Sequence, residues 1–401
     1  MSQKTLQNYI PALTGVRALA AYLVFISHYE YAFDESFPHG VKRFLQEFHF
    51  GVTIFFVLSG FLIAYRYYNN FYLTTDWFKQ YLKNRVARIY PMYFFLTIGA
   101  FIYFYCTGDS QVTAGFPHPF ALLLMNITFL RGFFQELKFT GIAQGWSLTV
   151  EECFYFSAPF IFLVAKKYNK FYIQPFVVTG LGALLVLVFR HFDWYGFFGS
   201  FTFMMVYTFL GRCFEFFVGI QLALIIHKKG VTRTNNLLYT YIGILMVFIC
   251  PLIMSQLSIP KGWTAGLHNP WGIITNNYLL ATSIAIFFYG LLTESTILKK
   301  ILSNKFVELL GKSSYIFYLI HLGYMYKYIH EGVNWLNDEV FVWYDKWGVD
   351  WHSPFEYDWL NLIYIFIILN GISILLFKTI EEPLNHYIRK SDFLIKAKKA
   401  D

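Results

Sequence analysis

The sequence predicts an all-α protein, a polytopic transmembrane helical bundle with about ten membrane spans. Hydrophobic residues make up 57% of the chain and charged residues only 14%, whereas about 25% of an average soluble protein is charged. The apolar residues gather into runs of roughly 17–23, long enough to cross a bilayer core of about 30 Å. So little charge could not cover a soluble globule, and such high hydrophobicity excludes a disordered chain.

Ten apolar runs are candidate spans, with boundaries expected to shift by about 2–4 residues. They cover residues 12–29, 50–68, 90–106, 146–165, 171–190, 205–227, 237–257, 271–292, 313–329 and 358–379. An eleventh run, 119–130, is too short to cross and is expected to be a re-entrant or interfacial segment. No internal repeat or low-complexity linker divides the chain, so residues 1–401 are expected to form a single domain.

Lys and Arg predict the orientation of the spans. With the N-terminus in the cytoplasm and each span crossing once, 22 of these residues lie in cytoplasmic segments and 8 in outer segments. Cytoplasmic loops of membrane proteins are enriched in positive charge, so both termini are predicted to be cytoplasmic. Segment 330–357 is then a long outer loop, acidic and rich in aromatic residues.

The net charge of +8 does not indicate a nucleic-acid partner, because the positive residues lie in short clusters between the apolar runs, as membrane topology requires. The four cysteines are widely separated and show no CxxC pair and no spacing with histidine that would suit zinc. We therefore expect no disulfide framework and no metal site, and interpret the cysteines as buried small apolar residues. No feature predicts an oligomeric state.

Ionisable residues inside the spans are candidate functional positions, because they cost several kcal/mol unless they face a partner or a cavity. The first span carries Arg17 and His28, eleven residues apart. Eleven helical residues rise about 16.5 Å and make about three turns plus 20°, so both side chains share one face. Arg17 is predicted near the cytoplasmic surface and His28 near the outer surface, where they could line a polar path. The alternative is that Arg17 snorkels to lipid phosphates and His28 is an interfacial residue.

Two further segments carry polar residues at helix contacts or membrane edges. In the second span Ser59 and Gly60 interrupt an aromatic run, which favours close helix packing over a direct role of Ser59 in a site. The segment RVARIYP places Arg85 and Arg88 three residues apart, on one helical face, before Pro91 at the start of the third span. Two guanidinium groups suit bidentate phosphate binding, although positive residues flank spans in any membrane protein.

Two carboxylates and a second histidine lie in other spans. Glu151 and Glu152 lie a few residues into the fourth span, on its outer side. A carboxylate there could orient His28 and raise its basicity, or it could cap the helix. His321 lies near the middle of the ninth span, where a lone histidine is more often a hydrogen-bonded core residue than a site residue.

Other charged groups in the spans have structural explanations. Arg212 and Glu215 are three residues apart in the sixth span and are expected to pair with each other. Glu381 and Glu382 precede Pro383, which is expected to stop the last span at the cytoplasmic edge.

Seven short segments share their order with a known family. They are Arg17-x10-His28, FFVLSGFLI at 55–63, RVARIYP at 85–91, WSLTVEECFYFSAP at 146–159, RCFEFFVG at 212–219, GKSSYIFYLIH at 311–321 and EEP at 381–383. Together they resemble acyltransferase family 3, the bacterial-type integral membrane acyltransferases. The resemblance implies a bacterial cytoplasmic-membrane enzyme that transfers an acyl group, usually acetyl from acetyl-CoA, to a hydroxyl of a sugar or glycan across the membrane.

The resemblance also implies roles for individual residues. The family's activity-linked arginine and histidine carry over to Arg17 and His28, its double-arginine motif to Arg85 and Arg88, and its WSL-x-VE glutamate to Glu151 rather than Glu152. Further candidate site residues within the motifs are Ser59, Trp146, Tyr155 and His321. Some relatives append an extracytoplasmic SGNH-type hydrolase domain; this chain ends 22 residues after its last predicted span, so none is expected.

The resulting hypothesis is acyl transfer across the membrane. Arg17, Arg85 and Arg88 would hold the phosphates of cytoplasmic acyl-CoA, and the rise of about 16.5 Å from Arg17 to His28 is of the order of the pantetheine arm. His28 would act as general base on the acceptor hydroxyl, or carry the acyl group transiently, with Glu151 orienting it. The expected partners are membrane lipids, acyl-CoA, and a glycan or lipid-linked saccharide acceptor.

Two other functions stay open from the sequence. A transporter or exporter would line its permeation path with Arg17, His28, Glu151 and His321. It explains the buried charges but accounts less well for the double arginine, and no inverted repeat is visible. A scaffold subunit of a polysaccharide-assembly complex would carry the same motifs in inactive form.

Overall fold

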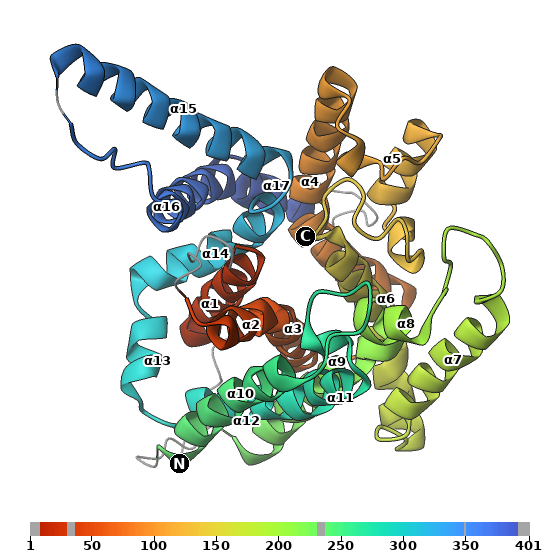
Figure 1. Cartoon of the computed structure of the whole chain (residues 1–401). Coiled ribbons are helices and arrows are strands. Elements are labelled where there is room, and N and C mark those ends of the chain that lie inside the picture. Colours follow the sequence, from red (N-terminus) through yellow and green to blue (C-terminus); the bar gives the residue numbers. More distant parts are fainter. Residues whose placement is uncertain (1–8, 30–36, 231–236, 349, 392–401) are drawn as a thin grey trace.

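The computed structural model describes residues 9–29, 37–230, 237–348 and 350–391 (Figure 1). Over these ranges the chain forms helices and no β-strand, which confirms the predicted fold class. The two chain ends, which the charge pattern places in the cytoplasm, lie outside the described residues.

Seventeen α-helices follow one another through the described ranges. The first nine are α1 (Pro11–His28), α2 (His39–Gln46), α3 (Gly51–Tyr67), α4 (Thr75–Thr107), α5 (Pro119–Ile127), α6 (Gly145–Tyr168), α7 (Gln174–Phe189), α8 (Phe201–Tyr207) and α9 (Phe209–Lys229). The others are α10 (Leu238–Gln256), α11 (Pro270–Ile274), α12 (Ala281–Thr293), α13 (Ile297–Leu302), α14 (Lys305–Ile320), α15 (Tyr324–Trp347), α16 (Asp358–Leu376) and α17 (Glu382–Lys390). Short 3₁₀ segments are η2 (Glu47–Phe50), η3 (Ser110–Val112), η4 (Leu130–Phe133) and η5 (Gly266–His268), and π-helical turns are η6 (Thr275–Leu280) and η7 (Phe377–Glu381).

Eight helical stretches of the described chain are long and apolar enough to cross a membrane. They are Pro11–His28, His39–Tyr67, Thr75–Thr107, Gly145–Tyr168, Phe201–Lys229, Leu238–Gln256, Pro270–Thr293 and Asp358–Lys390. The other two predicted spans correspond to α7 and α14, each of 16 residues. Sixteen residues rise about 24 Å, less than a typical bilayer core, but α14 packs inside the bundle between α1 and α16.

Two predicted spans differ from the helices that the structure contains. Helix α4 begins at Thr75, capped by the Thr74 hydroxyl, so RVARIYP lies inside it and Pro91 does not start the span. The segment before Arg85 contains the good helix formers Lys79, Gln80, Leu82 and Lys83, which favour extension of the helix beyond its apolar part. The predicted span 313–329 is wrong as a continuous helix, because α14 ends at Ile320 and Gly323 adopts a φ of +76°.

Two segments predicted to lie outside the spans, 119–130 and 330–357, contain helices. Segment 119–130 forms only the nine-residue helix α5, too short to cross, as predicted. Segment 330–357 is largely helical rather than a loop, because α15 runs to Trp347. Cys213 and Cys250 are buried as expected, but Cys106 is exposed.

Helix α1 lies at the centre of the bundle and packs against α3 and α14 (Figure 1). Glycines allow the closest approaches. A Cβ at Gly60 of α3 would lie 2.2 Å from the carbonyl oxygen of Phe216 in α9, and one at Gly219 would lie 2.1 Å from that of Val57. The predicted packing role of Gly60 is therefore confirmed.

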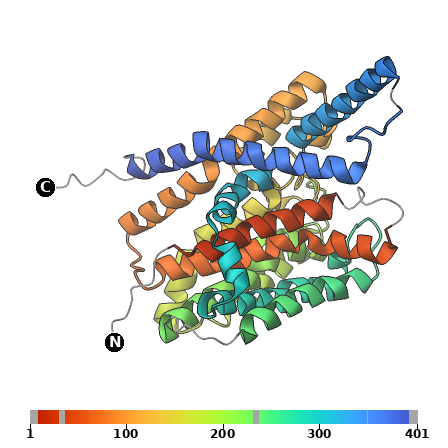
Figure 2. The ribbon, with the colours of Figure 1, turned by 90° about the vertical axis from the view of Figure 1, so that its left-hand side faces the viewer.

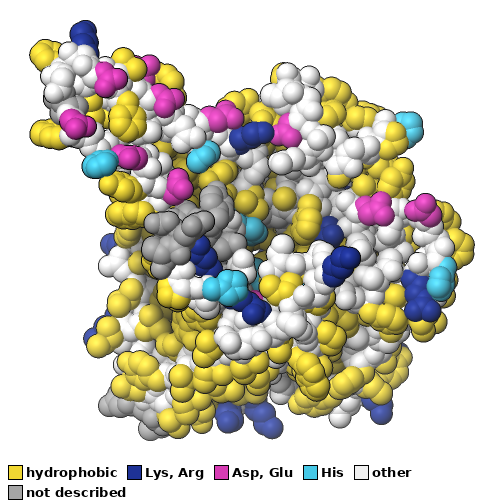
Figure 3. Space-filling view, viewed as in Figure 1, with side chains coloured by type: hydrophobic (Ala, Val, Ile, Leu, Met, Phe, Trp, Pro, Cys, Tyr) yellow, Lys and Arg dark blue, Asp and Glu magenta, His cyan; other side chains and the backbone are white. Residues whose placement is uncertain are grey.

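Helix α1 begins, and α17 ends, at the same end of the bundle (Figure 2). Helix α15 projects from the opposite end (Figure 2). Figure 3 shows this end, with acidic side chains gathered on α15 beside a recess in the middle of the face. The exposed acidic residues of α15 are Glu331, Asp338, Glu339 and Asp345.

Candidate active site

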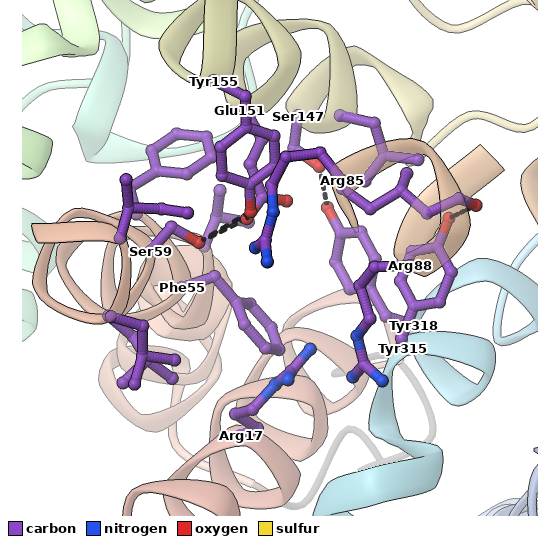
Figure 4. A pocket seen from close by; sticks show the side chains of 17 residues that line it. Arg17, Phe55, Ser59, Arg85, Arg88, Ser147, Glu151, Tyr155, Tyr315 and Tyr318 are labelled. Atoms are coloured by element: carbon purple, nitrogen blue, oxygen red, sulfur yellow. Dashed lines mark hydrogen bonds between the residues drawn. The ribbon is translucent and has the colours of Figure 1, made fainter. Parts of the chain in front are cut away.

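Three arginines from two helices line one cavity of the bundle. Arg17 comes from α1, and Arg85 and Arg88 come from α4, so the two helices bring together residues about 70 positions apart. Figure 4 shows the three guanidinium groups pointing into the same space. The lining also includes Phe55, Ser59, Ser147, Glu151, Tyr155, Tyr315 and Tyr318.

The cavity arginines are only partly neutralised. An Arg88 guanidinium nitrogen lies 3.0 Å from the carboxylate of Glu381, which is 2% exposed. Arg85 lies over the rings of Tyr67 and Tyr155, 5.8 and 5.5 Å from their centroids, and its buried Nε has no hydrogen-bond partner. The cavity therefore presents positive charge and free N–H donors, which suit an anionic ligand.

Glu151 belongs to the arginine cavity rather than to His28. The hydroxyls of Ser59 and Tyr155 both donate to its Oε1 (Figure 4). Tyr155 lies one helical turn after Glu151 in α6, and Ser59 faces both from α3. The expectation that Glu151 orients His28 is therefore wrong, because the rotation of α6 aims its carboxylate at α3. Glu152 is not part of the cavity lining.

Helix α1 connects the cavity to a second polar group. It runs without interruption from Pro11 to His28, so Arg17 lies in its first half and His28 is its last residue. Arg17 shares the cavity with Tyr315 and Tyr318 of α14, and His28 contacts the end of the same helix. Both side chains thus face α14, as the eleven-residue spacing predicts.

His28 pairs with His321. The Nδ1 atom of His28 lies 2.8 Å from the Val24 carbonyl oxygen and 3.3 Å from His321 Nε2. His28 is exposed, whereas His321 is fully buried. His321 follows the last residue of α14, where the chain leaves the helix before Gly323. It is hydrogen-bonded in the core, as expected of a lone histidine, but its partner is the candidate base.

Trp146 lies outside the cavity. Its ring packs edge-on against Tyr207, with 4.9 Å between ring centroids. The Tyr207 hydroxyl lies 2.9 Å from His268 Nε2, and the ammonium of Lys138 lies 5.2 Å from the centre of the Tyr207 ring. Burial lowers the pKa of Lys138 to about 8. Trp146 thus belongs to an aromatic cluster that joins the loop before α6 to α8 and η5.

The remaining charged pair in the spans is Arg212 with Glu215. Arg212 Nε donates to Glu215 Oε1 at 2.8 Å, and both side chains are buried, which confirms the predicted structural pair. Within the part of the chain that the structure describes, no three His, Cys, Asp or Glu side chains are grouped to hold a metal ion.

Several cavity residues were not singled out from the sequence. Tyr315, Tyr318 and Ser147 lie inside recognised segments, but their direction depends on how α6 and α14 rotate in the bundle. The Tyr318 and Ser147 hydroxyls lie 2.8 Å apart, and the Tyr315 hydroxyl donates to the Ile89 carbonyl at 2.8 Å. The sequence predicts Glu381 at the membrane edge, because it precedes Pro383. The π-helical turn η7 points it inward to Arg88.

The chain is similar to known proteins over most of its length. A family profile described as an acyltransferase domain matches residues 10–376. An O-acetyltransferase OatA from Staphylococcus aureus is 23% identical over 331 residues, which are 78% of this chain and 50% of the relative. This chain therefore spans about half the length of that relative.

Two further relatives match shorter stretches. A peptidoglycan O-acetyltransferase OatA from Listeria monocytogenes is 27% identical over 198 residues, 44% of this chain and 28% of the relative. An acyltransferase MdmB from Streptomyces mycarofaciens is 25% identical over 163 residues, 39% of this chain and 40% of the relative. No solved structure gives a significant match.

Proposed function

The chain belongs to acyltransferase family 3, and we propose that it moves an acetyl group from cytoplasmic acetyl-CoA to a hydroxyl of an extracytoplasmic glycan or lipid-linked saccharide. The names of the relatives support the transfer of an acetyl group to an oxygen atom, since they describe O-acetyltransferases, and one of them names peptidoglycan.

The observation that carries the proposal is the convergence of three guanidinium groups on one cavity. Three positive charges face two carboxylates, Glu151 and Glu381. An anion would relieve the repulsion between the guanidiniums, and their planar N–H pairs match phosphate oxygens. Coenzyme A carries a diphosphate and a further phosphate, so it satisfies the charge and the geometry together.

Tyr318 of α14 lines the cavity and also neighbours the histidine pair. Phe55, Ser147 and Tyr318 supply an apolar and weakly polar lining that suits a pantetheine arm. The Tyr318 ring lies 5.7 Å from the ring of His321, which contacts His28. A donor held by Arg17 and its neighbours could thus bring its thioester to His28 over the rise of about 16.5 Å along α1.

The proposed reaction uses His28 as general base. His28 takes the proton of the acceptor hydroxyl while the hydroxyl oxygen attacks the thioester carbonyl carbon. The carbon–sulfur bond then breaks, and the proton passes from His28 to the leaving sulfur, giving an acetyl ester and the free thiol of coenzyme A. Base catalysis of this kind typically contributes about 10²–10⁴-fold. In a two-step variant, the imidazole itself carries the acetyl group before the hydroxyl attacks.

Glu151 has a different role in this proposal from the one expected from the sequence. Its carboxylate holds the Ser59 and Tyr155 hydroxyls and balances part of the arginine charge. Glu151 thus shapes the donor cavity and does not orient His28.

Family membership also favours acyl transfer over a transporter. A permeation path would need Arg17, Glu151 and the histidines along one continuous route. Instead Arg17 and Glu151 line a cavity, and the buried His321 is hydrogen-bonded on both ring nitrogens.

Binding of labelled acetyl-CoA to the purified full chain in lipid nanodiscs tests the donor site. We expect Arg17→Ala and Arg85→Ala each to weaken binding about 10–100-fold, because a hydrogen bond to a charged group contributes about 1.5–3 kcal/mol. Lys79→Ala is the matched control, since Lys79 is an exposed cation on α4 away from the cavity. Unchanged affinity in both arginine variants would remove them from the donor site.

A further inference from the structure

The two histidines next to the cavity have defined protonation states. His321 Nδ1 lies 2.8 Å from the carbonyl oxygen of Tyr318. A carbonyl oxygen can only accept a hydrogen bond, so this nitrogen carries the proton. In the neutral imidazole the other nitrogen, Nε2, then has a free lone pair.

The same reasoning fixes the tautomer of His28. Its Nδ1 lies 2.8 Å from the Val24 carbonyl oxygen and 3.3 Å from the Nε2 lone pair of His321. Both neighbours are acceptors, so His28 Nδ1 carries the proton and donates to both. In the neutral imidazole His28 Nε2 is therefore unprotonated, and this residue is the exposed member of the pair.

His321 is held firmly enough to impose this arrangement. It is 0% exposed, its ring stacks on Phe317 with an interplanar angle of 10°, and its carbonyl oxygen accepts from the Tyr29 hydroxyl. Tyr29 follows His28 directly, so it ties the end of α1 to the end of α14. The break before Gly323 leaves His321 at the helix end, where its ring reaches α1.

We infer that His321 is a positioning residue that locks His28 in the tautomer with a bare Nε2, the atom that takes the proton of the acceptor hydroxyl. The inference rests on the proposed function and assigns to His321 the task that Glu151 was expected to perform. When His28 gains a proton, its Nδ1–H still has two acceptors, and the pair can share the added proton through the contact between the rings. A neutral imidazole thus replaces the carboxylate that often orients a catalytic histidine.

Two substitutions of similar size separate this role from simple packing. His321→Gln keeps an acceptor oxygen near the position of Nε2, whereas His321→Leu fills the space without one. We expect His321→Leu to lower kcat about 10–100-fold, the usual effect of losing a group that orients a functional ligand or base. The KM for acetyl-CoA should not change, and His321→Gln should recover most of kcat.

The outcomes separate this inference from the proposed function. A wild-type chain that neither binds nor uses acetyl-CoA would overturn the proposed function itself. With an active wild-type chain, full kcat in His321→Leu, or equal loss in the Gln and Leu variants, would overturn the role of His321.

A chemical probe tests, without enzyme activity, whether His28 has an accessible unprotonated nitrogen, and it also applies if the variants do not fold. Diethyl pyrocarbonate acylates unprotonated, accessible imidazole nitrogens, and peptide mass spectrometry locates the adducts. In the wild-type chain we expect His28 to react at least as fast as the exposed His39 of α2, and His321 not to react. Protection of His28 in the intact chain would overturn the inference.

Discussion

Glu381 is a buried carboxylate beside one of the three cavity arginines, 3.0 Å from Arg88. In the proposed function, its negative charge competes with that of a bound donor for Arg88. Removing its charge while keeping its shape should favour an anionic ligand by on the order of 1 kcal/mol, or about fivefold in affinity. We therefore predict tighter acetyl-CoA binding in Glu381→Gln, measured by equilibrium binding at low ionic strength.

The neighbouring glutamate provides a matched control for this prediction. Glu382 is 51% exposed and pairs with Lys378 on the surface, so Glu382→Gln should leave the affinity unchanged. Weaker binding in Glu381→Gln would show that the carboxylate orients Arg88 for the ligand rather than competing with it.

At the residue scale, the sequence predicted pairs of charged residues along one helix better than contacts between residues of different helices. Spacing along one helix was sufficient for Arg85 with Arg88, and for Arg212 with Glu215. Contacts between helices were not predictable in the same way. Glu151 and His28 lie at similar predicted depths, but depth does not fix how a helix is rotated, and Glu151 faces Ser59 instead.

At the element scale, the contact between α3 and α9 depends on the absence of a side chain at Gly60. A Cβ there would lie 2.2 Å from a backbone oxygen of Phe216, so the two helices would have to separate. Overpacking of this kind typically costs about 1–3 kcal/mol. We predict a lower thermal unfolding midpoint for Gly60→Ala in detergent, together with lower activity, because the adjacent Ser59 lines the cavity.

Gly180 of α7 makes a suitable control for the glycine prediction. A Cβ at Gly180 would have no neighbour within 4 Å, and alanine favours a helix over glycine by about 1 kcal/mol. Gly180→Ala should therefore leave the unfolding midpoint unchanged or raise it. An equal decrease in both variants would show that the close approach at Gly60 is not the cause.

Hydropathy identified the elements but not where they bend or extend. It located all eight helical stretches that are long and apolar enough to cross, because length and apolar content suffice for that. It could not show that α4 continues through a charged stretch back to Thr75. It also missed the break before Gly323, where a positive φ ends α14 inside an apolar segment. That break brings His321 to His28, so hydropathy alone could not predict this contact.

At the scale of the whole molecule, α1 and α14 link the arginine cavity to the histidine pair. Arg17 lies toward the end where α1 begins, and His28 lies at the other end of the same helix. Helix α17 ends on the side where α1 begins (Figure 2). The charge pattern predicts that this side is cytoplasmic.

In the proposed function, the donor enters from the side where α1 begins and the acetyl group leaves on the side of His28. The most direct test adds labelled acetyl-CoA to sealed membrane vesicles of known orientation that contain the native glycans. We predict labelled glycan in inside-out vesicles, lost with His28→Ala, and none in right-side-out vesicles. Equal labelling in both orientations would contradict transfer across the membrane.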